Sequence, residues 1–153
     1  MQYVQPRRFL LTLLVMAAML SATALVAAPA DAVPSCSWTS CNGLDPHATG
    51  CDVGASTMDD FTYSAYFELR YSSTCHAVWT RVTSQVTYNT IFGQIRAYQS
   101  YPTSVNSPTY LMYGVQARAG TYWTAMVSYG YWVRSCADDW FSTVAPIVCT
   151  AVH

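Results

Sequence analysis

The sequence predicts an all-β fold, a small disulfide-stabilised antiparallel sandwich or barrel of about six to eight short strands. Short runs rich in Val, Thr, Tyr and Trp recur along residues 61–150, with polar turn residues between them. No stretch beyond residue 32 has the period of an amphipathic helix, and all six cysteines lie beyond that residue. An even number of cysteines in an exported chain indicates a disulfide framework. A chain of 153 residues has the size of one domain.

Residues 1–32 predict a secretory signal peptide. Arg7 and Arg8 precede an apolar run at 9–20, and small residues follow in two Ala-x-Ala patterns that end at Ala30 and Ala32. The apolar run is too short for a membrane span, which needs roughly 20 residues. We therefore expect cleavage after Ala32, with Ala30 as the alternative, and a mature chain that is secreted, extracellular and without a membrane span.

The expected mature chain, residues 33–153, carries little charge. It keeps five arginines and seven acidic residues, a net charge of about −2, and the whole chain has no lysine. So weak a charge offers little attraction to phosphates or to anionic lipid. We therefore expect no nucleic-acid partner.

Residues 33–60 are predicted to form a cysteine-rich loop segment before an antiparallel β domain at 61–153, the two making one folded unit. Gly, Pro, Asn, Asp and Ser are frequent in the segment, and a turn is expected where Asp45 precedes Pro46. Its apolar residues are too few to bury it, so disulfides are expected to hold it against the β domain. The pairing stays open, since six cysteines allow many connectivities. The cysteines are Cys36, Cys41, Cys51, Cys75, Cys136 and Cys149.

The first predicted strand, 61–71, alternates strictly. Its apolar side chains, such as Phe67 and Leu69, occupy odd positions, and its polar ones, such as Glu68 and Arg70, occupy even positions. This alternation predicts one buried face and one solvent-exposed face. A run rich in Val and Thr at 75–87 predicts an antiparallel partner that forms a hairpin with it. Further strands are predicted at 91–101, 110–118, 122–128, 130–136 and 143–150.

Two blocks of sequence resemble a known family. The blocks read C-x-G-x-D-P at 41–46, with Gly50 and Cys51 after it, and E-L-R-Y-S-x-x-C-x-A-x-W-x-R at 68–81. They resemble the YjfA-like family of small secreted proteins of Gram-positive, mainly actinobacterial, bacteria, which carry a domain of unknown function. The resemblance implies export, a disulfide-bonded β domain and a bacterial source, and it supplies no catalytic residues. The motif residues that we single out are Asp45, Glu68, Arg70, Trp79 and Arg81.

Glu68 has a structural and a catalytic interpretation. It lies two residues from Arg70 on the polar face of one strand, where Arg81 on the returning strand can pair with it as a structural ion pair on or near the surface. The catalytic alternative makes Glu68 the acid or base of a small hydrolase of cell-wall glycan. Its second carboxylate would come from one of three aspartates, Asp45, Asp138 or Asp139. No sequence pattern brings these groups together, so no catalytic residue is assigned.

Cys75 stands beside His76, which raises the question of a cysteine nucleophile or a metal site. The even number of cysteines favours a disulfide for Cys75. The histidines are far apart in the sequence: His47, His76 and His153. The sequence has no paired C-x-x-C motifs of the kind that bind zinc, and it lacks the regularly spaced acidic residues of an EF-hand calcium loop. We therefore expect no metal and no cofactor.

The aromatic residues are the remaining functional signal, with 20 Trp, Tyr and Phe among the 121 residues of the mature chain. Tyr and Trp rings suit binding surfaces for sugars and proteins, and they equally suit packing within a small sheet. The surface where we expect binding combines aromatic residues near two connections with neighbouring arginines. Its residues are Tyr101, Tyr110, Tyr129, Tyr131, Trp132, Arg96 and Arg118, with Arg134 as a further arginine.

The favoured hypothesis is therefore a secreted, non-enzymatic, disulfide-bonded β protein. It would bind another secreted protein or an envelope polysaccharide through this aromatic and arginine surface. The alternatives are the small glycan hydrolase and a structural subunit of a secreted assembly that docks through a sheet edge or the cysteine-rich segment. The sequence leaves the ligand, the strand order and the oligomeric state open.

Overall fold

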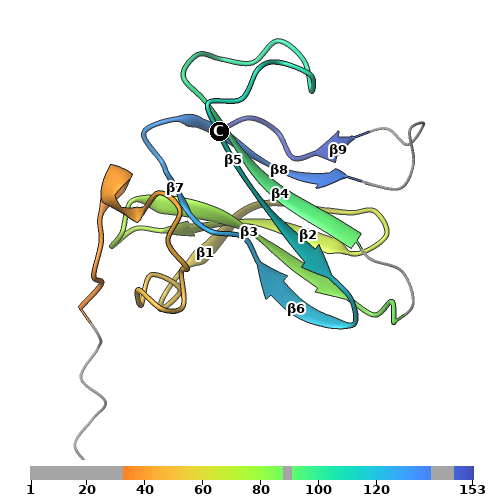
Figure 1. Cartoon of the computed structure of the whole chain (residues 1–153), viewed down its shortest axis with the longest axis horizontal. Coiled ribbons are helices and arrows are strands. Elements are labelled where there is room, and N and C mark those ends of the chain that lie inside the picture. Colours follow the sequence, from red (N-terminus) through yellow and green to blue (C-terminus); the bar gives the residue numbers. More distant parts are fainter. Residues whose placement is uncertain (1–32, 88–90, 139–146) are drawn as a thin grey trace, which may run out of the picture. The chain divides into compact units, whose positions relative to one another are not determined.

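The computed structural model describes residues 33–87, 91–138 and 147–153 (Figure 1). The predicted signal peptide and the first half of the predicted strand 143–150 lie outside these residues. The described chain is almost entirely β, in two antiparallel sheets, which confirms the predicted fold class. In this part of the chain, no helix has the length and apolar character that a membrane span requires.

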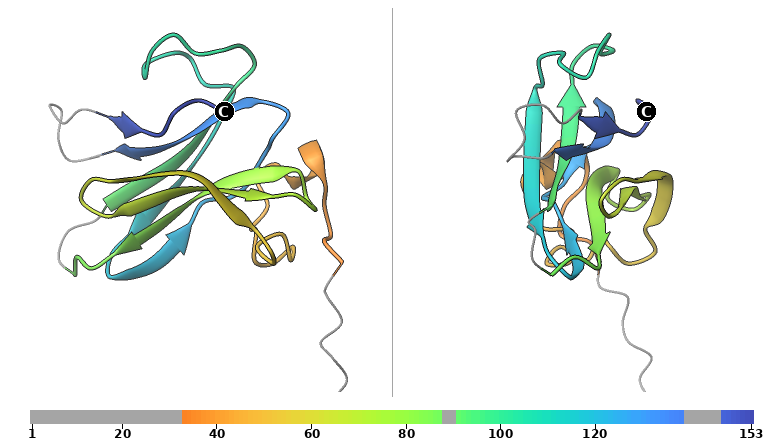
Figure 2. Two further views of the ribbon diagram at one scale, coloured as in Figure 1. Left: turned by 180° about the vertical axis from the view of Figure 1, so that it is seen from behind. Right: turned by 90° about the vertical axis from the view of Figure 1, so that its right-hand side faces the viewer.

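The two sheets pack face to face as two layers (Figure 2). The first sheet has the order β1-β2-β3-β6, with β7 also paired to β3, and the second has the order β5-β4-β8-β9. The strands of the first sheet are β1 (Ser56–Thr62), β2 (Tyr66–Ser72), β3 (Ala77–Ser84), β6 (Gly120–Trp123) and β7 (Val127–Ser128). Those of the second are β4 (Ile91–Tyr98), β5 (Leu111–Ala117), β8 (Trp132–Asp138) and β9 (Val148–Cys149).

The prediction of one strand at 61–71 was wrong, because β1 and β2 form a hairpin that turns at residues 63–65. β1 also begins at Ser56, within the segment that was predicted to be loop. Phe61 and Phe67 are direct cross-strand partners with stacked rings, 4.8 Å between centroids. Phe61 and Phe67 therefore both occupy odd positions, on either side of a turn that contains neither Gly nor Pro. The alternation of apolar and polar residues continues through the turn, and no glycine or proline marks it in the sequence.

The predicted antiparallel partner at 75–87 is confirmed as β3, which pairs with β2 along its whole length. The predicted strand 122–128 divides into β6 and β7, and both pair with β3. The division adds a strand to the expected number, as does the hairpin of β1 and β2.

The core lies between the two sheets. Phe67, Leu69 and Val82 of the first sheet are fully buried, as are Ile95 and Val133 of the second. At the contact between β3 and β4 the layers approach so closely that a Cβ atom on Gly93 would lie 2.3 Å from a methyl group of Val82. Any larger residue at position 93 would push the layers apart.

A second, smaller core lies on the outer face of the first sheet, where the cysteine-rich segment covers it. The segment includes a 3-10 helix, η3 (Trp38–Cys41). This outer cluster consists of buried residues from the segment, from β3 and from the chain before β7: Cys36, Cys41, Cys51, Cys75, Ala77, Trp79 and Met126. The predicted solvent-exposed face of the hairpin is therefore partly covered.

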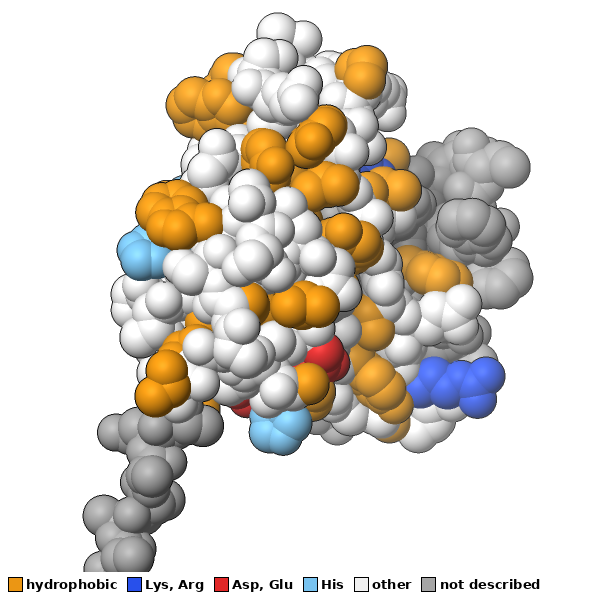
Figure 3. Space-filling model, turned by 60° about the vertical axis from the view of Figure 1, so that its left-hand side comes forward, with side chains coloured by type: hydrophobic (Ala, Val, Ile, Leu, Met, Phe, Trp, Pro, Cys, Tyr) orange, Lys and Arg blue, Asp and Glu red, His pale blue; other side chains and the backbone are white. Residues whose placement is uncertain are grey.

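All six cysteines lie in the described residues and form three disulfides, Cys36–Cys41, Cys51–Cys75 and Cys136–Cys149. The second joins the segment to the turn between β2 and β3, as expected of a segment that cannot bury itself. The third joins β8 to β9. On the face shown in Figure 3, charged side chains are few, and hydrophobic ones lie among uncharged polar groups.

Candidate functional site

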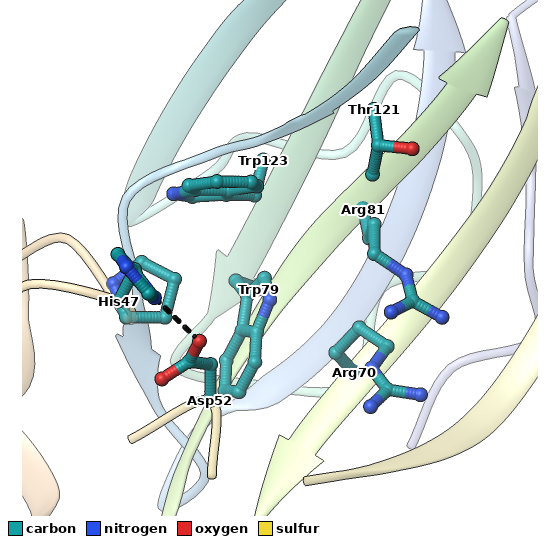
Figure 4. Close-up of a pocket in the computed structure, with 8 residues that line it drawn as sticks. His47, Asp52, Arg70, Trp79, Arg81, Thr121 and Trp123 are labelled. Atoms are coloured by element: carbon teal, nitrogen blue, oxygen red, sulfur yellow. Dashed lines mark hydrogen bonds and ion pairs between the residues drawn. The ribbon is translucent and has the colours of Figure 1, made fainter. Parts of the chain in front are cut away.

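A pocket of about 160 Å³ opens on the outer face of the first sheet, at the edge of the covering segment (Figure 4). We call it the tryptophan pocket. Its lining comes from the cysteine-rich segment, from β2 and β3, and from β6: Pro46, His47, Asp52, Arg70, Trp79, Arg81, Thr121 and Trp123.

The register of the strands explains why these side chains meet. Arg70 of β2 is the cross-strand partner of Trp79 of β3, and Arg81 of β3 is the partner of Trp123 of β6. Alternate residues of a strand point to the same face, so Trp79 and Arg81 share the outer face with their partners. The two arginines lie side by side on one side of Trp79, and His47 and Asp52 lie on the other (Figure 4).

Glu68 lies beside the pocket and is ion-paired, as the structural interpretation predicted. Its carboxylate accepts hydrogen bonds from Arg81 Nε and Nη2 at 2.5 and 2.6 Å and from the Thr57 hydroxyl at 2.7 Å, and Arg70 Nη1 lies 3.7 Å away. The expectation of a solvent-exposed residue was wrong, since Glu68 is only 3% exposed. The covering side chains come from Thr57 and the two arginines, which the alternation within one strand does not reveal.

The pKa of Glu68 lies below its ordinary value. Burial raises it, but the hydrogen bonds from Arg81 and Thr57 and the positive charges of Arg81 and Arg70 outweigh that effect. The carboxylate therefore stays ionised and has its oxygens occupied. A general acid needs the opposite, a raised pKa and a free path to its substrate.

Arg70 lines the pocket and is anchored by hydrogen bonds to β1 and to the residue before it. Its Nη1 donates to the Thr57 hydroxyl at 2.6 Å, and its Nη2 donates to the carbonyl of Ala55. Arg70 and Arg81 both lie beside the carboxylate of Glu68, which Arg81 binds through two nitrogens.

The opposite wall is organised by Asp45. Its Oδ1 accepts the backbone N–H groups of His47 and Ala48 at 2.8 and 2.9 Å, and its Oδ2 accepts the indole N–H of Trp123 at 2.9 Å. Burial raises the pKa of Asp45, but these hydrogen bonds outweigh it, so the pKa is lowered. Asp45 thus fixes the ring of Trp123, which remains 38% exposed.

His47 and Asp52 form an exposed pair, with His47 Nδ1 2.8 Å from Asp52 Oδ2. The hydrogen bond to Asp52 raises the pKa of His47 above its ordinary value, and the negative charges of Asp52 and Asp45 add to this. The pair places a polar edge beside the indole ring of Trp123, whose centroid lies 6.0 Å from that of His47.

The five motif residues of the sequence therefore converge on one site. Arg70, Trp79 and Arg81 line the pocket, Glu68 pairs with Arg81, and Asp45 holds Trp123. The combination supplies aromatic faces, positively charged donors and carboxylate acceptors around a small cavity, which suits recognition of a ring-sized polar group.

Sequence reasoning missed four further side chains of the pocket, those of His47, Asp52, Thr121 and Trp123. The contact between Asp45 and Trp123 joins residues 78 positions apart. No periodicity reports such a pairing. The one available signal was the D-P turn followed by a histidine, with the nearest acid five residues further on.

The predicted aromatic surface gathers at another place, on the connections before β5 and before β8. We call it the tyrosine cluster: Tyr101, Tyr110, Tyr129, Tyr131 and Trp132. The rings of Tyr101 and Trp132 meet edge to face, and those of Tyr110 and Tyr131 are tilted, each pair 5.2 Å between centroids. Tyr129, Tyr131 and Trp132 line a shallow hollow of about 380 Å³. Trp132 is 43% exposed, and Tyr101 and Tyr110 more than that.

Two arginines that were expected to extend this surface are buried. Arg96 donates to Gln94 Oε1 and to the carbonyl of Val105, and Arg134 donates to the hydroxyl of Tyr98 and to the carbonyl of Ser104. The expectation that they extend the aromatic surface was wrong, because both are buried and their guanidinium groups bind carbonyls of the connection between β4 and β5.

Arg118 is exposed and stands between β5 and β6. The aspartates of the hydrolase hypothesis do not gather around Glu68 in what the structure describes. Asp45 is bound to Trp123, Asp138 ends β8 in the other sheet, and Asp139 lies outside the described residues.

The family model described as "Protein of unknown function (DUF2690)" matches residues 39–139, a range that contains the whole tryptophan pocket. No curated protein and no solved structure matches the chain. The predicted domain of unknown function is confirmed. The YjfA-like and actinobacterial features of the resemblance stay predictions.

Proposed function

Since the chain belongs to the DUF2690 family of proteins of unknown function, its activity has to be inferred from its site, and we propose a secreted, non-enzymatic binding protein for envelope polysaccharide. The observation that carries the proposal is the exposed indole of Trp123, fixed by Asp45 beside the charged groups of the tryptophan pocket. A fixed aromatic face binds the apolar face of a sugar ring at little cost in side-chain entropy.

The size and chemistry of the pocket support a sugar. A cavity of about 160 Å³ is close to one that holds a benzene ring, so one pyranose ring or a substituent of it can enter. Arg70, Arg81 and His47 supply donors for ring hydroxyls, and Asp52 supplies an acceptor. Flanking sugars of a polymer would extend beyond the pocket.

Both carboxylates next to the pocket support binding rather than hydrolysis. The pKa values of Glu68 and Asp45 are lowered, and the carboxylate of each accepts three hydrogen bonds from the protein. An acid catalyst of glycoside cleavage instead needs a carboxyl group that is protonated near neutral pH.

Co-sedimentation with purified envelope polysaccharide tests the proposal. Trp123→Ala should weaken binding about tenfold, because an aromatic contact contributes roughly 0.5–1.5 kcal/mol beyond its buried area. Trp132→Ala is the matched control, since Trp132 is similarly exposed but lies in the tyrosine cluster. Equal weakening by both substitutions, or by neither, would contradict the proposal.

Export is tested separately on the protein from a producing culture. We expect a chain that begins at Val33, with a mass lower than that of the reduced form by the six hydrogens of three disulfides. Three disulfides are compatible with an extracellular location. A full-length chain retained inside the cells would contradict export.

An extracellular protein partner is the second candidate. The exposed tyrosine cluster favours it, because Tyr and Trp are enriched at protein interfaces and its hollow is wide and shallow. Binding of a protein that Trp132→Ala weakens and Trp123→Ala does not would assign this function to the cluster.

A further inference from the structure

Two disulfides of the covering segment lie side by side and bring four sulfur atoms together. Cys36–Cys41 and Cys51–Cys75 place all four Sγ atoms within 4.8 Å of one another, and every one of these residues is buried. Cys36 Sγ and Cys51 Sγ, which are not bonded to each other, are 3.6 Å apart. We propose that this four-cysteine cluster, when its disulfides are reduced, is a tetrathiolate site for one Zn²⁺ ion.

The spacing of the sulfurs fits the ion. Four thiolates at roughly 2.3 Å from Zn²⁺ stand at the corners of a tetrahedron about 3.8 Å apart. The contact between Cys36 and Cys51 already has nearly this length, and the largest separation in the cluster exceeds it by about 1 Å. Once a disulfide is reduced, its two sulfur atoms can reach this separation by rotation of the cysteine side chains.

One pair of the ligands also has a sequence spacing found in structural zinc sites. Four residues separate Cys36 from Cys41, within the C-x₂₋₄-C range of such sites. Cys51 and Cys75 come from two further backbone segments. A search for C-x-x-C pairs does not reveal this site, because four residues rather than two separate Cys36 from Cys41.

Backbone hydrogen bonds hold these segments together independently of the sulfur oxidation state. The N–H of Trp38 donates to the carbonyl of Cys75 at 2.8 Å. Gly43 N–H donates to the carbonyl of Met126, and Met126 N–H donates to that of Leu44, both at 2.9 Å. Reduction removes the covalent links but leaves these contacts, so the thiols stay near one another.

The surroundings suit a soft cation. The cluster packs against Ala77, Trp79 and Met126, an apolar shell that excludes oxygen ligands and water. His76 follows Cys75 directly, and its Nδ1 is buried without a hydrogen-bond partner in the described part of the chain.

The chemistry balances with a dithiol as the reductant. Each protein disulfide takes two electrons and two protons and becomes two thiols, while the dithiol becomes a disulfide. Four thiols then bind one Zn²⁺ as thiolates and release four protons. A small-molecule disulfide reverses the step: two equivalents of it accept four electrons from the four thiolates and become four thiolates themselves, while the two protein disulfides form again and the ion leaves.

Cys136–Cys149 provides an internal control. It joins β8 to β9 in the second sheet and does not belong to the group of four sulfurs. Its thiols should stay free when the cluster binds metal.

The test adds Co²⁺ or Zn²⁺ to the protein after reduction by a phosphine, without oxygen. We expect one ion per chain, thiolate-to-cobalt charge-transfer absorption that Zn²⁺ abolishes, and protection of four thiols from alkylation while Cys136 and Cys149 react. Cys136→Ser/Cys149→Ser should keep the cobalt spectrum, and Cys36→Ser/Cys41→Ser should lose it.

Alkylation of all six thiols at equal rates in the presence of Zn²⁺ would overturn the proposal. Retention of the cobalt spectrum in Cys36→Ser/Cys41→Ser would overturn it as well. Should the reduced chain be unfolded, the native circular dichroism should return on addition of Zn²⁺. The protection pattern of the unsubstituted protein decides the matter even if a variant fails to fold.

Discussion

The tryptophan pocket and the tyrosine cluster both expose a tryptophan, but they are built in different ways. Trp123 of the pocket is fixed by a hydrogen bond to Asp45, with two arginines and a histidine around it. Trp132 of the cluster is fixed by the edge of another ring, that of Tyr101.

The arginines mark the difference most clearly. In the pocket, Arg70 and Arg81 reach the cavity, whereas Arg96 and Arg134 near the cluster lie buried beneath it. Polar groups aimed at a cavity give directional recognition, and rings that contact only other rings give an adaptable apolar surface. The pocket therefore suits one defined chemical group, and the cluster suits a broader protein face.

The largest expected effect comes from removing the disulfide that supports the pocket. Cys51→Ser/Cys75→Ser should lower the free energy of unfolding by about 3 kcal/mol. It should also abolish polysaccharide binding, because His47 and Asp52 lie on the segment that this disulfide fastens to the first sheet. Thermal unfolding and co-sedimentation measure the two effects.

Cys136→Ser/Cys149→Ser is the matched control. It should cost a somewhat smaller free energy of unfolding, since its cysteines are 13 rather than 24 positions apart, but it should leave binding intact. Equal loss of binding in both variants would show that the loss does not come from detaching the cysteine-rich segment from the first sheet.

The next effect concerns the buried ion pair under the pocket. Glu68→Gln should lower the free energy of unfolding by about 2 kcal/mol, because it leaves two arginines facing a neutral amide. This loss of stability is smaller than the loss expected for a fully buried ion pair, since the Arg81 side chain is 37% exposed. Chemical denaturation measures it, and Arg118→Gln, a change at an exposed arginine that does not line the pocket, serves as the control.

The same variant has a defined pH dependence. The folded pKa of Glu68 is lowered, so its contribution is present above the ordinary value of 4.5 and is lost as the pH falls through the folded pKa. The stability difference between the unsubstituted protein and Glu68→Gln should therefore shrink in acid. Glycan cleavage by the unsubstituted protein that disappears in a folded Glu68→Gln would establish the hydrolase instead.

A smaller effect is expected from a change beneath the tyrosine cluster that leaves the tryptophan pocket untouched. Arg134→Met removes the donor to the Tyr98 hydroxyl and the Ser104 carbonyl, at a cost of about 1 kcal/mol. Amide hydrogen exchange should quicken in residues 99–110, whereas polysaccharide binding should not change. Weaker polysaccharide binding without faster amide hydrogen exchange would show that the two surfaces are coupled.

The two regions also differ in how far the sequence predicts them. The tyrosine cluster was predicted as a group, because its members are close to one another on two connections and turn residues reveal those connections. The burial of Arg96 and Arg134 was not predicted, because each lies next to an apolar residue in a strand, as an exposed arginine also would.

The pocket was predicted only in part. Period-two spacing places Glu68 with Arg70 and Trp79 with Arg81, and an antiparallel hairpin then brings the pairs together. The cover over that face, and with it the burial of Glu68, depends on disulfide pairing and on contacts between residues 45 and 123. Such contacts arise from the tertiary fold, and neither composition nor periodicity contains them.

The smallest expected effect tests the outer wall of the pocket by pH. The folded pKa of His47 is raised by the hydrogen bond to Asp52, so the pair contributes fully below the unfolded value of 6.5 and its contribution is lost as the pH rises through the folded pKa. The thermal midpoint of the unsubstituted protein should exceed that of His47→Gln at pH values below 6.5, and the two should converge in alkaline solution. Asp52→Asn should remove the same pH dependence, because the pair needs both partners. A difference that grows with rising pH would mean that His47 acts in its neutral form, and the polar edge of the pocket would then be an acceptor for sugar hydroxyls rather than a donor.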